Sequence, residues 1–329
     1  MLSPVLAFRP ASVVSRLPAR SDACPLSLRD LLSASDARLP ALVAASPGVI
    51  RAGLVAAKVL HSALGLMLPR GVAPGPWFQA VVRTADEIAA GLPLALGAEV
   101  VLADRGAMAV ERATAEVWRL VEVGLTYAIV DPGDGPPEEC GRVLAELAAP
   151  LLERGLGFAC ALRLRGEPGA GRRALAMLDD LRRRGAAPDA VSLALPAPPD
   201  AEGARAQLGG LDRLAAALGG VPLLRQGPIS PALLAAVASS RVRGCEDGGA
   251  AARASEARAA EGGEEAPEAG ARRARWQEQA ERLLGVDEAD RLEARAFVVA
   301  AELVEALGAG GSAVAVAGGL ERRQAEDRA

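Results

Sequence analysis

The chain has 329 residues, of which 51% are hydrophobic and only 2% aromatic, and its formal net charge is −4. This apolar content is enough for one large domain or two medium ones, with a core built from Ala, Val and Leu. The slight negative charge and the few aromatic side chains argue against nucleic-acid binding. Because no apolar run reaches the ~18 residues of a membrane-spanning helix, we also expect no membrane partner.

The N-terminal residues and the cysteines bear on where the protein resides. We expect residues 1–25 to form a disordered extension. Its first 21 residues carry three arginines and no acid before Asp22. That composition is typical of a transit peptide or of a frayed bacterial N-terminus. The cysteines are far apart in the sequence, which predicts reduced thiols and a cytoplasmic location. They are Cys24, Cys140, Cys160 and Cys245.

Short apolar segments alternate with longer helical segments between residues 26 and 246. The strand candidates are Leu42–Ser46, Ala63–Leu68, Val100–Asp104, Tyr127–Asp131, Phe158–Arg165, Ala190–Leu195, Val221–Gln226 and Val242–Glu246. The helix candidates include Met108–Gly124, Glu138–Arg154, Arg172–Arg184, Ala201–Leu218 and Pro231–Ser239. This alternation predicts an α/β fold, a (β/α)8 TIM barrel over residues 26–246. A doubly wound open sheet is the alternative, although no Gly-rich phosphate turn follows the first strand.

The composition changes after residue 246. Residues 247–271 are mostly Gly, Ala and Glu, so they bury too little apolar surface to fold and predict a flexible insert. Residues 272–308 predict a C-terminal helical extension. The apolar stripe along Ala289–Leu307 would pack on the barrel or on a second copy. We expect residues 309–329 to be a disordered tail.

Three phrases occur in the order and on the strands that one enzyme family uses. Val101–Gly106 reads VLADRG where that family has Asp-His-Gly. Val123–Asp131 (VGLTYAIVD) is the closest local match, and Val221–Gly227 reads VPLLRQG where the family has Val-Pro-Leu-Val-Leu-His-Gly. In these phrases the chain resembles the class II ketose-bisphosphate aldolases, especially the tagatose-bisphosphate branch with its non-catalytic subunits. The resemblance implies a TIM barrel and, if the chain is active, a carbon–carbon lyase of carbohydrate metabolism.

The same resemblance implies that the metal site of the family is lost. The family holds zinc with the His of Asp-His-Gly, a Glu after the fifth strand and two further His after the sixth and seventh. Here those positions fall on Arg105, on Arg163 or Arg165, on the Pro196–Pro198 segment and on Gln226. Arginine stays protonated and has no lone pair to give to a cation. We therefore expect no metal and no other cofactor.

Charged and turn-forming residues at the predicted strand ends are the candidate site. Asp104 stands at the acid/base aspartate of the family and is the candidate catalytic residue, although it could instead be ion-paired with a neighbouring Arg. The arginines could hold a phosphate or carboxylate in a forked geometry, or form salt bridges with acids at the same rim. The candidate ligand-binding residues are Arg105, Asp131, Arg163, Arg165, Arg225, Gln226, Gly227 and Ser230.

These residues support three hypotheses. The first is an aldolase-like barrel that has lost zinc-dependent cleavage and either binds a small anionic metabolite, such as a sugar phosphate, or serves a catalytic paralogue as a non-catalytic regulatory partner. The second is a metal-independent lyase or isomerase on sugar phosphates, with Asp104 as proton shuttle. The third is a structural subunit of a homo-oligomer.

Overall fold

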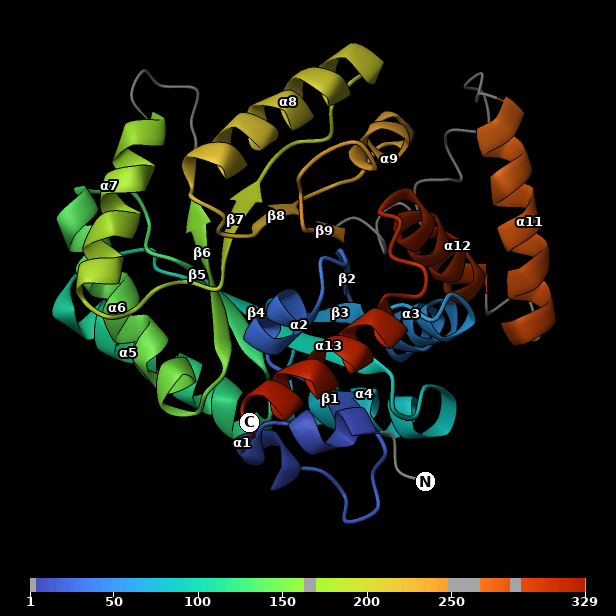
Figure 1. The fold of residues 1–329 in the computed structure, drawn as a ribbon, viewed down its shortest axis with the longest axis horizontal. Helices are drawn as coiled ribbons and strands as arrows, with labels where there is room; N and C mark the ends of the chain where they lie inside the picture. Colours follow the sequence, from blue (N-terminus) through green and yellow to red (C-terminus); the bar gives the residue numbers. More distant parts are fainter. Residues whose placement is uncertain (1–3, 163–169, 248–266, 285–290, 329) are drawn as a thin grey trace.

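The computed structural model describes residues 4–162, 170–247, 267–284 and 291–328 (Figure 1). Strands β2 to β9 all pair in parallel, and the pairing of β4 with β5 closes them into an eight-stranded barrel. The strands are β2 (Leu39–Val43), β3 (Leu64–Leu68), β4 (Pro93–Val101), β5 (Tyr127–Asp131), β6 (Gly157–Leu162), β7 (Ala190–Ala194), β8 (Leu223–Gln226) and β9 (Gly244–Asp247). The predicted (β/α)8 barrel is confirmed, and closure excludes the open-sheet alternative.

Helices connect successive strands and surround the barrel (Figure 1). They are α3 (Pro47–Val59), α4 (Pro74–Ile88), α5 (Ala107–Val123), α6 (Pro137–Glu153), α7 (Ala170–Arg183), α8 (Ala201–Ala217) and α9 (Pro231–Val237). Local sequence fixes where several of them begin. Ser46 accepts a hydrogen bond from the Val49 amide at 3.3 Å, with Pro47 in the first helical position. Asp200 caps α8 in the same way through the Gly203 amide at 2.7 Å.

Most strand boundaries differ from the prediction by no more than two residues, but β2 and β4 are shifted further. Strand β2 covers Leu39–Val43 rather than Leu42–Ser46, and Ser46 lies beyond it as the cap of α3. Strand β4 covers Pro93–Val101, whereas the prediction was Val100–Asp104. Asp104 therefore lies beyond the strand, in the turn that leads into α5.

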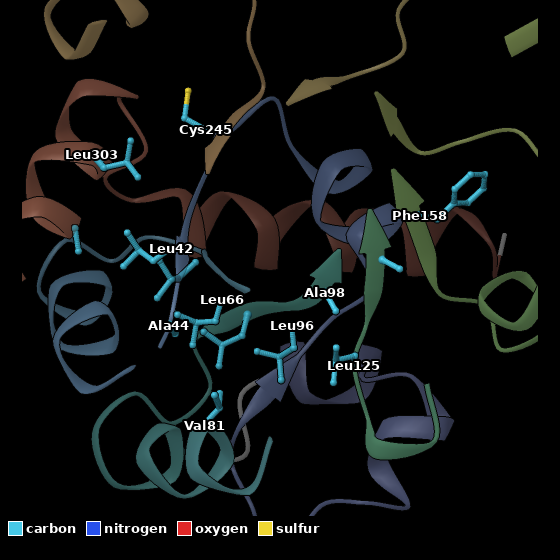
Figure 2. Close-up of a cluster of buried hydrophobic side chains, with 14 of the residues drawn as sticks. Leu42, Ala44, Leu66, Val81, Leu96, Ala98, Leu125, Phe158, Cys245 and Leu303 are labelled. Carbon is cyan, nitrogen blue, oxygen red and sulfur yellow. The ribbon is translucent and has the colours of Figure 1, made fainter. Parts of the chain in front are cut away.

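The larger core lies between the barrel and its helices. Leu42, Leu66 and Leu96 are 0% exposed and point outward from adjacent strands. Figure 2 shows them together with Val81 of α4 and Leu303 of α12 (Arg291–Ala306). This burial on the outer face explains why the strands appear as continuous apolar runs in the sequence.

The N-terminal end of the barrel is closed by segments from both chain termini. These are η1 (Pro4–Phe8), β1 (Cys24–Pro25), α2 (Leu28–Ala34) and α13 (Ser312–Glu326). The short helix α1 (Ala11–Val14) packs on α5 instead, and its Val13 belongs to the outer core. Helices α2 and α13 lie side by side near β4 (Figure 1), and their buried side chains form one cluster with the barrel interior. The segments 1–25 and 309–329, which the sequence predicts to be disordered, contain η1, α1, β1 and α13, and their buried residues Val5, Leu6, Val316 and Leu320 belong to the apolar cluster.

The other C-terminal helices pack on the outside of the barrel. They are α11 (Pro267–Leu284) and α12 (Arg291–Ala306). The apolar stripe predicted here packs on α3 within the same chain, and Phe297 at its centre is 0% exposed. Most of the predicted flexible insert, residues 248–266, lies outside the described residues. None of the described helices has both the length and the hydropathy needed to span a membrane.

Candidate functional site at the C-terminal mouth of the barrel

The barrel interior is lined mainly by short side chains and a few large ones. Side chains alternate along each strand, so those two residues apart share a face. Gly97 of β4 faces inward, where a Cβ would collide with the Tyr127 ring and with Met67. The Tyr127 hydroxyl in turn donates a hydrogen bond to the Met67 sulfur at 2.7 Å. Glycine at position 97 therefore lets tyrosine fill the middle of the barrel.

Above this apolar layer, polar side chains meet at the C-terminal strand ends. Gln226 of β8 donates through Nε2 to Oε2 of Glu246 on β9 at 3.2 Å. The two residues are register partners on adjacent strands. Glu99 of β4 faces the same interior because its neighbours Ala98 and Val100 belong to the outer core. The mouth thus carries two carboxylates and an amide on three different strands.

Glu246 is the most perturbed acid of this group. Its pKa is raised to about 7, first because burial disfavours the charged carboxylate and second because of the Glu99 charge, while the Gln226 hydrogen bond opposes the shift. The Tyr127 pKa is raised well above 10, mainly by burial and further by the Glu246 charge. A carboxyl that titrates near neutral pH in a barrel mouth is a candidate proton-transfer group.

Asp104, the predicted catalytic residue, lies three residues beyond the end of β4. It is exposed, and its Oδ1 accepts a hydrogen bond from the Gly106 amide at 3.0 Å. This bond orders the turn at the start of α5. The placement differs from our expectation because β4 ends three residues earlier than predicted.

Arg105 and Asp131 shape the loops around the mouth. Arg105 Nη1 lies 3.2 Å from a carboxylate oxygen of Glu139, and its side chain fills the space that Gly135 leaves open. Asp131 ends β5, where it is 6% exposed and accepts a hydrogen bond from the Gly133 amide at 2.9 Å. Both residues therefore hold the loop between β5 and α6 in shape.

Arg225, predicted to bind ligand, points outward and is 0% exposed. Its Nε donates to the Gln207 side chain of α8 at 3.0 Å. Its remaining hydrogen bonds, between 3.0 and 3.3 Å, go to backbone carbonyls of Leu195, Pro196, Gly227 and Pro228. Burial lowers the pKa of this guanidinium. Arg225 is thus a brace between the loops that follow β7 and β8.

Gly227 and Ser230 have structural roles in the loop between β8 and α9. Gly227 has φ of 113°, and a Cβ there would collide with the Leu195 carbonyl oxygen. Ser230 caps α9 by accepting a hydrogen bond from the Leu233 amide at 3.3 Å. Arg163 and Arg165 lie outside the described residues. Of the predicted ligand-binding residues that are described, Gln226 lies in the polar mouth, and Asp131 follows Tyr127 and Ile129 on the inward face of β5.

Of the positions where the resemblance places metal ligands of the aldolase family, Arg105, residues 196–198 and Gln226 are described. Where the resemblance places the first ligand, Arg105 offers a guanidinium, which has no lone pair for a cation. At another of these positions, Gln226 donates a hydrogen bond to Glu246. Among the residues that the structure describes, no three His, Cys, Asp or Glu side chains converge as a metal site would require.

The two acids of the mouth, Glu99 and Glu246, were not among the predicted site residues. For Glu99 a signal was present, because a charged residue within the apolar run Leu94–Val101 suggests an inward-facing position at a strand end. The shifted boundary of β4 concealed it. For Glu246 the sequence placed a carboxylate at the strand end, but only barrel closure brings it against Gln226.

Neither a protein-family model nor a curated protein matches the sequence. Among solved structures, the YdjI aldolase from Escherichia coli K12 is 14% identical, with 87% of this chain and 98% of that chain covered and a TM-score of 0.52. A proposed fructose-1,6-biphosphate aldolase from Coccidioides immitis is 16% identical over 87% and 97%, with a TM-score of 0.51. A proposed tagatose 6 phosphate kinase from Sinorhizobium meliloti 1021 is 15% identical over 87% and 98%, also at 0.51. At these identities the likeness shows the fold, an aldolase-like TIM barrel.

Proposed function

We propose that this chain binds a small hydroxyl-bearing carbonyl compound at the mouth of its barrel and moves a proton on that compound without a divalent metal. The observation that carries the proposal is the Glu246–Gln226 pair, in which a carboxyl with a pKa of about 7 lies beside an amide donor. The aldolase-like fold supports the substrate class, since barrel enzymes use the C-terminal end of the strands for chemistry.

The polar groups of the mouth suit a ligand with hydroxyl and carbonyl oxygens. Carboxylates accept hydrogen bonds from hydroxyl groups, and an amide both donates and accepts. Glu99 and Glu246 provide the acceptors, while one N–H of the Gln226 amide remains beyond its bond to Glu246. Two of the arginines predicted to bind the ligand, Arg105 and Arg225, are used instead to hold the loops around the mouth in place.

The chemistry is a proton transfer next to a carbonyl group. The Glu246 carboxylate takes a proton from the carbon beside the carbonyl, and the electron pair of that C–H bond becomes the C=C bond of an enediolate. The negative charge moves to the former carbonyl oxygen, where the second N–H of Gln226 can donate. Return of the proton to the same carbon re-forms the original carbonyl and gives exchange. Return to the neighbouring carbon gives isomerisation, in which the hydroxyl proton of the first carbon moves to the oxyanion so that the carbonyl group changes place. A base with a pKa near the working pH is the most effective for such a step.

A non-catalytic role is the alternative within the same fold. In that case the mouth binds the compound, and the chain acts as a regulatory partner of a catalytic paralogue. The four cysteines are free and buried, which supports a reducing compartment such as the cytoplasm for either role.

The test is hydrogen exchange from dihydroxyacetone in deuterated buffer, followed by proton NMR with chelator-treated protein. We expect exchange by the native chain and a loss of about 100-fold or more in Glu246→Gln. The matched control is Glu146→Gln, an exposed carboxyl on α6 that is 46% exposed and pairs with Arg142.

Three results would overturn the proton-transfer proposal. They are equal rates in Glu246→Gln and the native chain, exchange that chelation abolishes and Zn²⁺ restores, and binding of dihydroxyacetone without exchange. The last result would support the non-catalytic role instead.

A further inference from the structure

A cleft opens beside the mouth, between the loop that joins β3 to α4 and helix α5. Its volume is about 350 Å³, which is within the range of small-molecule sites in proteins. Glu99 forms part of its lining, and the Glu99 charge also acts on Glu246. One side chain therefore borders both the cleft and the polar mouth.

Two arginines from different elements line this cleft. Arg70 comes from the loop after β3, and Arg119 comes from α5. Their side chains are 69% and 57% exposed, so most of their N–H groups face solvent. None of the candidate arginines at the mouth that the structure describes has this exposure, since Arg225 is buried and the Arg105 side chain is 26% exposed.

Each of these arginines has one acidic partner. Arg70 Nη2 lies 2.9 Å from Oε2 of Glu99. Arg119 bonds to both carboxylate oxygens of Glu116, at 2.6 and 2.8 Å, one turn away on the same helix. Exposed ion pairs of this kind contribute little to stability, so a ligand anion can share or replace the acidic partner.

We propose that the cleft is the subsite for an oxyanion group, a phosphate or a carboxylate, on the compound that the mouth binds. A guanidinium presents parallel N–H groups that match such an anion in a forked geometry. Arg70 bonds to Glu99 through Nη2 alone, and Arg119 would transfer its forked Nε and Nη2 from Glu116 to the anion. This inference rests on the proposed function for the other end of the ligand, because Glu99 connects the two regions. It narrows the substrate class to small hydroxyl-bearing carbonyl compounds that carry one anionic group.

The direct test is binding of inorganic phosphate and of acetate, with glycerol as the neutral comparison, measured by calorimetry. The variants are Arg70→Ala and Arg119→Ala. The matched control is Arg142→Ala, because Arg142 is 44% exposed and also pairs with an acid on its own helix. We expect each cleft variant to weaken phosphate binding by about tenfold or more and the control to leave it unchanged.

The two probes also distinguish the phosphate and carboxylate forms of the ligand. Tighter binding of phosphate favours a phosphorylated compound, and tighter binding of acetate favours a carboxylic acid. The subsite is refuted if neither anion binds at tens of millimolar, if both cleft variants bind as the native chain does, or if Arg142→Ala loses as much affinity as they do.

Failure of the subsite and failure of the proposed function give different results. Inorganic phosphate has no carbon to react, so its binding reports on the cleft alone. Dihydroxyacetone has no anionic group, so its exchange reports on the mouth alone. If both sites act on one ligand, dihydroxyacetone phosphate exchanges faster than dihydroxyacetone at equal low concentration, and Arg70→Ala reduces that preference. An unchanged preference in Arg70→Ala would contradict the link between them.

Discussion

The two ends of the barrel use the same eight strands for opposite purposes. At the N-terminal end, leucines of α2 and aliphatic residues of α13 join the barrel interior in one apolar cluster. At the C-terminal end, Glu99, Gln226 and Glu246 leave a polar interior beside an open cleft. This difference indicates that the N-terminal end contributes most to stability. The C-terminal end can therefore carry charged groups, although burying them costs some free energy of folding.

The N-terminal end of the barrel is closely packed. Gly319 of α13 lies so near α2 that a Cβ would collide with the Ala34 carbonyl oxygen. Ser312 at the start of α13 accepts a hydrogen bond from the Ala63 amide at 2.8 Å, at the base of β3. The mouth has no comparable cover among the described residues. Its loops are braced from outside by Arg105 and Arg225.

The largest effect is expected from removing an apolar side chain at the closed end. Leu28 of α2 is 0% exposed, and Leu28→Ala leaves a cavity that should lower the free energy of unfolding by about 2–5 kcal/mol. Urea unfolding measures the change. Leu283→Ala is the control, because Leu283 is 40% exposed, and it should stay within about 0.5 kcal/mol of the native chain. A loss below about 1 kcal/mol in Leu28→Ala would contradict the difference between the two ends.

The next effect concerns the buried acid of the mouth. Glu246 has a folded-state pKa of about 7 against an ordinary value of 4.5. Between these two pH values the folded chain keeps a proton that the unfolded chain releases. The free energy of unfolding therefore falls as pH rises through this window, and the loss is complete above pH 7.

Glu246→Gln removes this dependence and keeps a hydrogen-bonding partner for Gln226. The variant should be more stable than the native chain at pH 8, by at most about 3 kcal/mol because the side chain is partly open to solvent. The two chains should converge near pH 4.5. Urea unfolding across this range measures the difference, with Glu146→Gln as the control. Parallel pH profiles for the native chain and Glu246→Gln would be inconsistent with the buried acid.

The smallest effect is expected from the outer brace of the mouth. Arg225→Met keeps the bulk of the side chain but leaves the carbonyls of two loops without their donor. We expect a loss of about 2 kcal/mol, since some of these carbonyls regain contact with water. Arg225→Lys should recover part of it through its charge, but not the forked geometry. If Arg225→Met unfolds at the same urea concentration as the native chain, the brace is unnecessary.

The sequence predicted the barrel well because its signal is repeated. Each strand–helix unit gives a short apolar run and a longer amphipathic segment, so an error of a few residues in one unit leaves the fold unchanged. Ser46 and Asp200 cap their helices through short-range hydrogen bonds, although the prediction had placed Ser46 at the end of the first strand. The closed end was not predicted, because the segments at the two chain ends become ordered only against each other and the barrel.

The candidate site was harder to predict because it depends on which face each residue occupies. Asp104 and Glu99 belong to one chain segment. The predicted bounds of β4 put Asp104 at the strand end, whereas the observed bounds put Glu99 on the strand and Asp104 in the following turn. Arg225 and Gln226 are neighbours in sequence but point to opposite sides of β8, one toward α8 and one toward Glu246. Side chains alternate between the inner and outer faces of a strand. Which residues face inward can be assigned only when the first and last residues of the strand are known.

By itself the sequence determined the order of strands and helices, the caps that separate them and the apolar content that lets them close. These features depend on contacts between residues near one another in the chain. Only the tertiary structure decided that the chain ends close one side of the barrel and that Glu246 meets Gln226 on the other. Those contacts join distant segments, and burial within them raises the pKa of Glu246 toward neutrality.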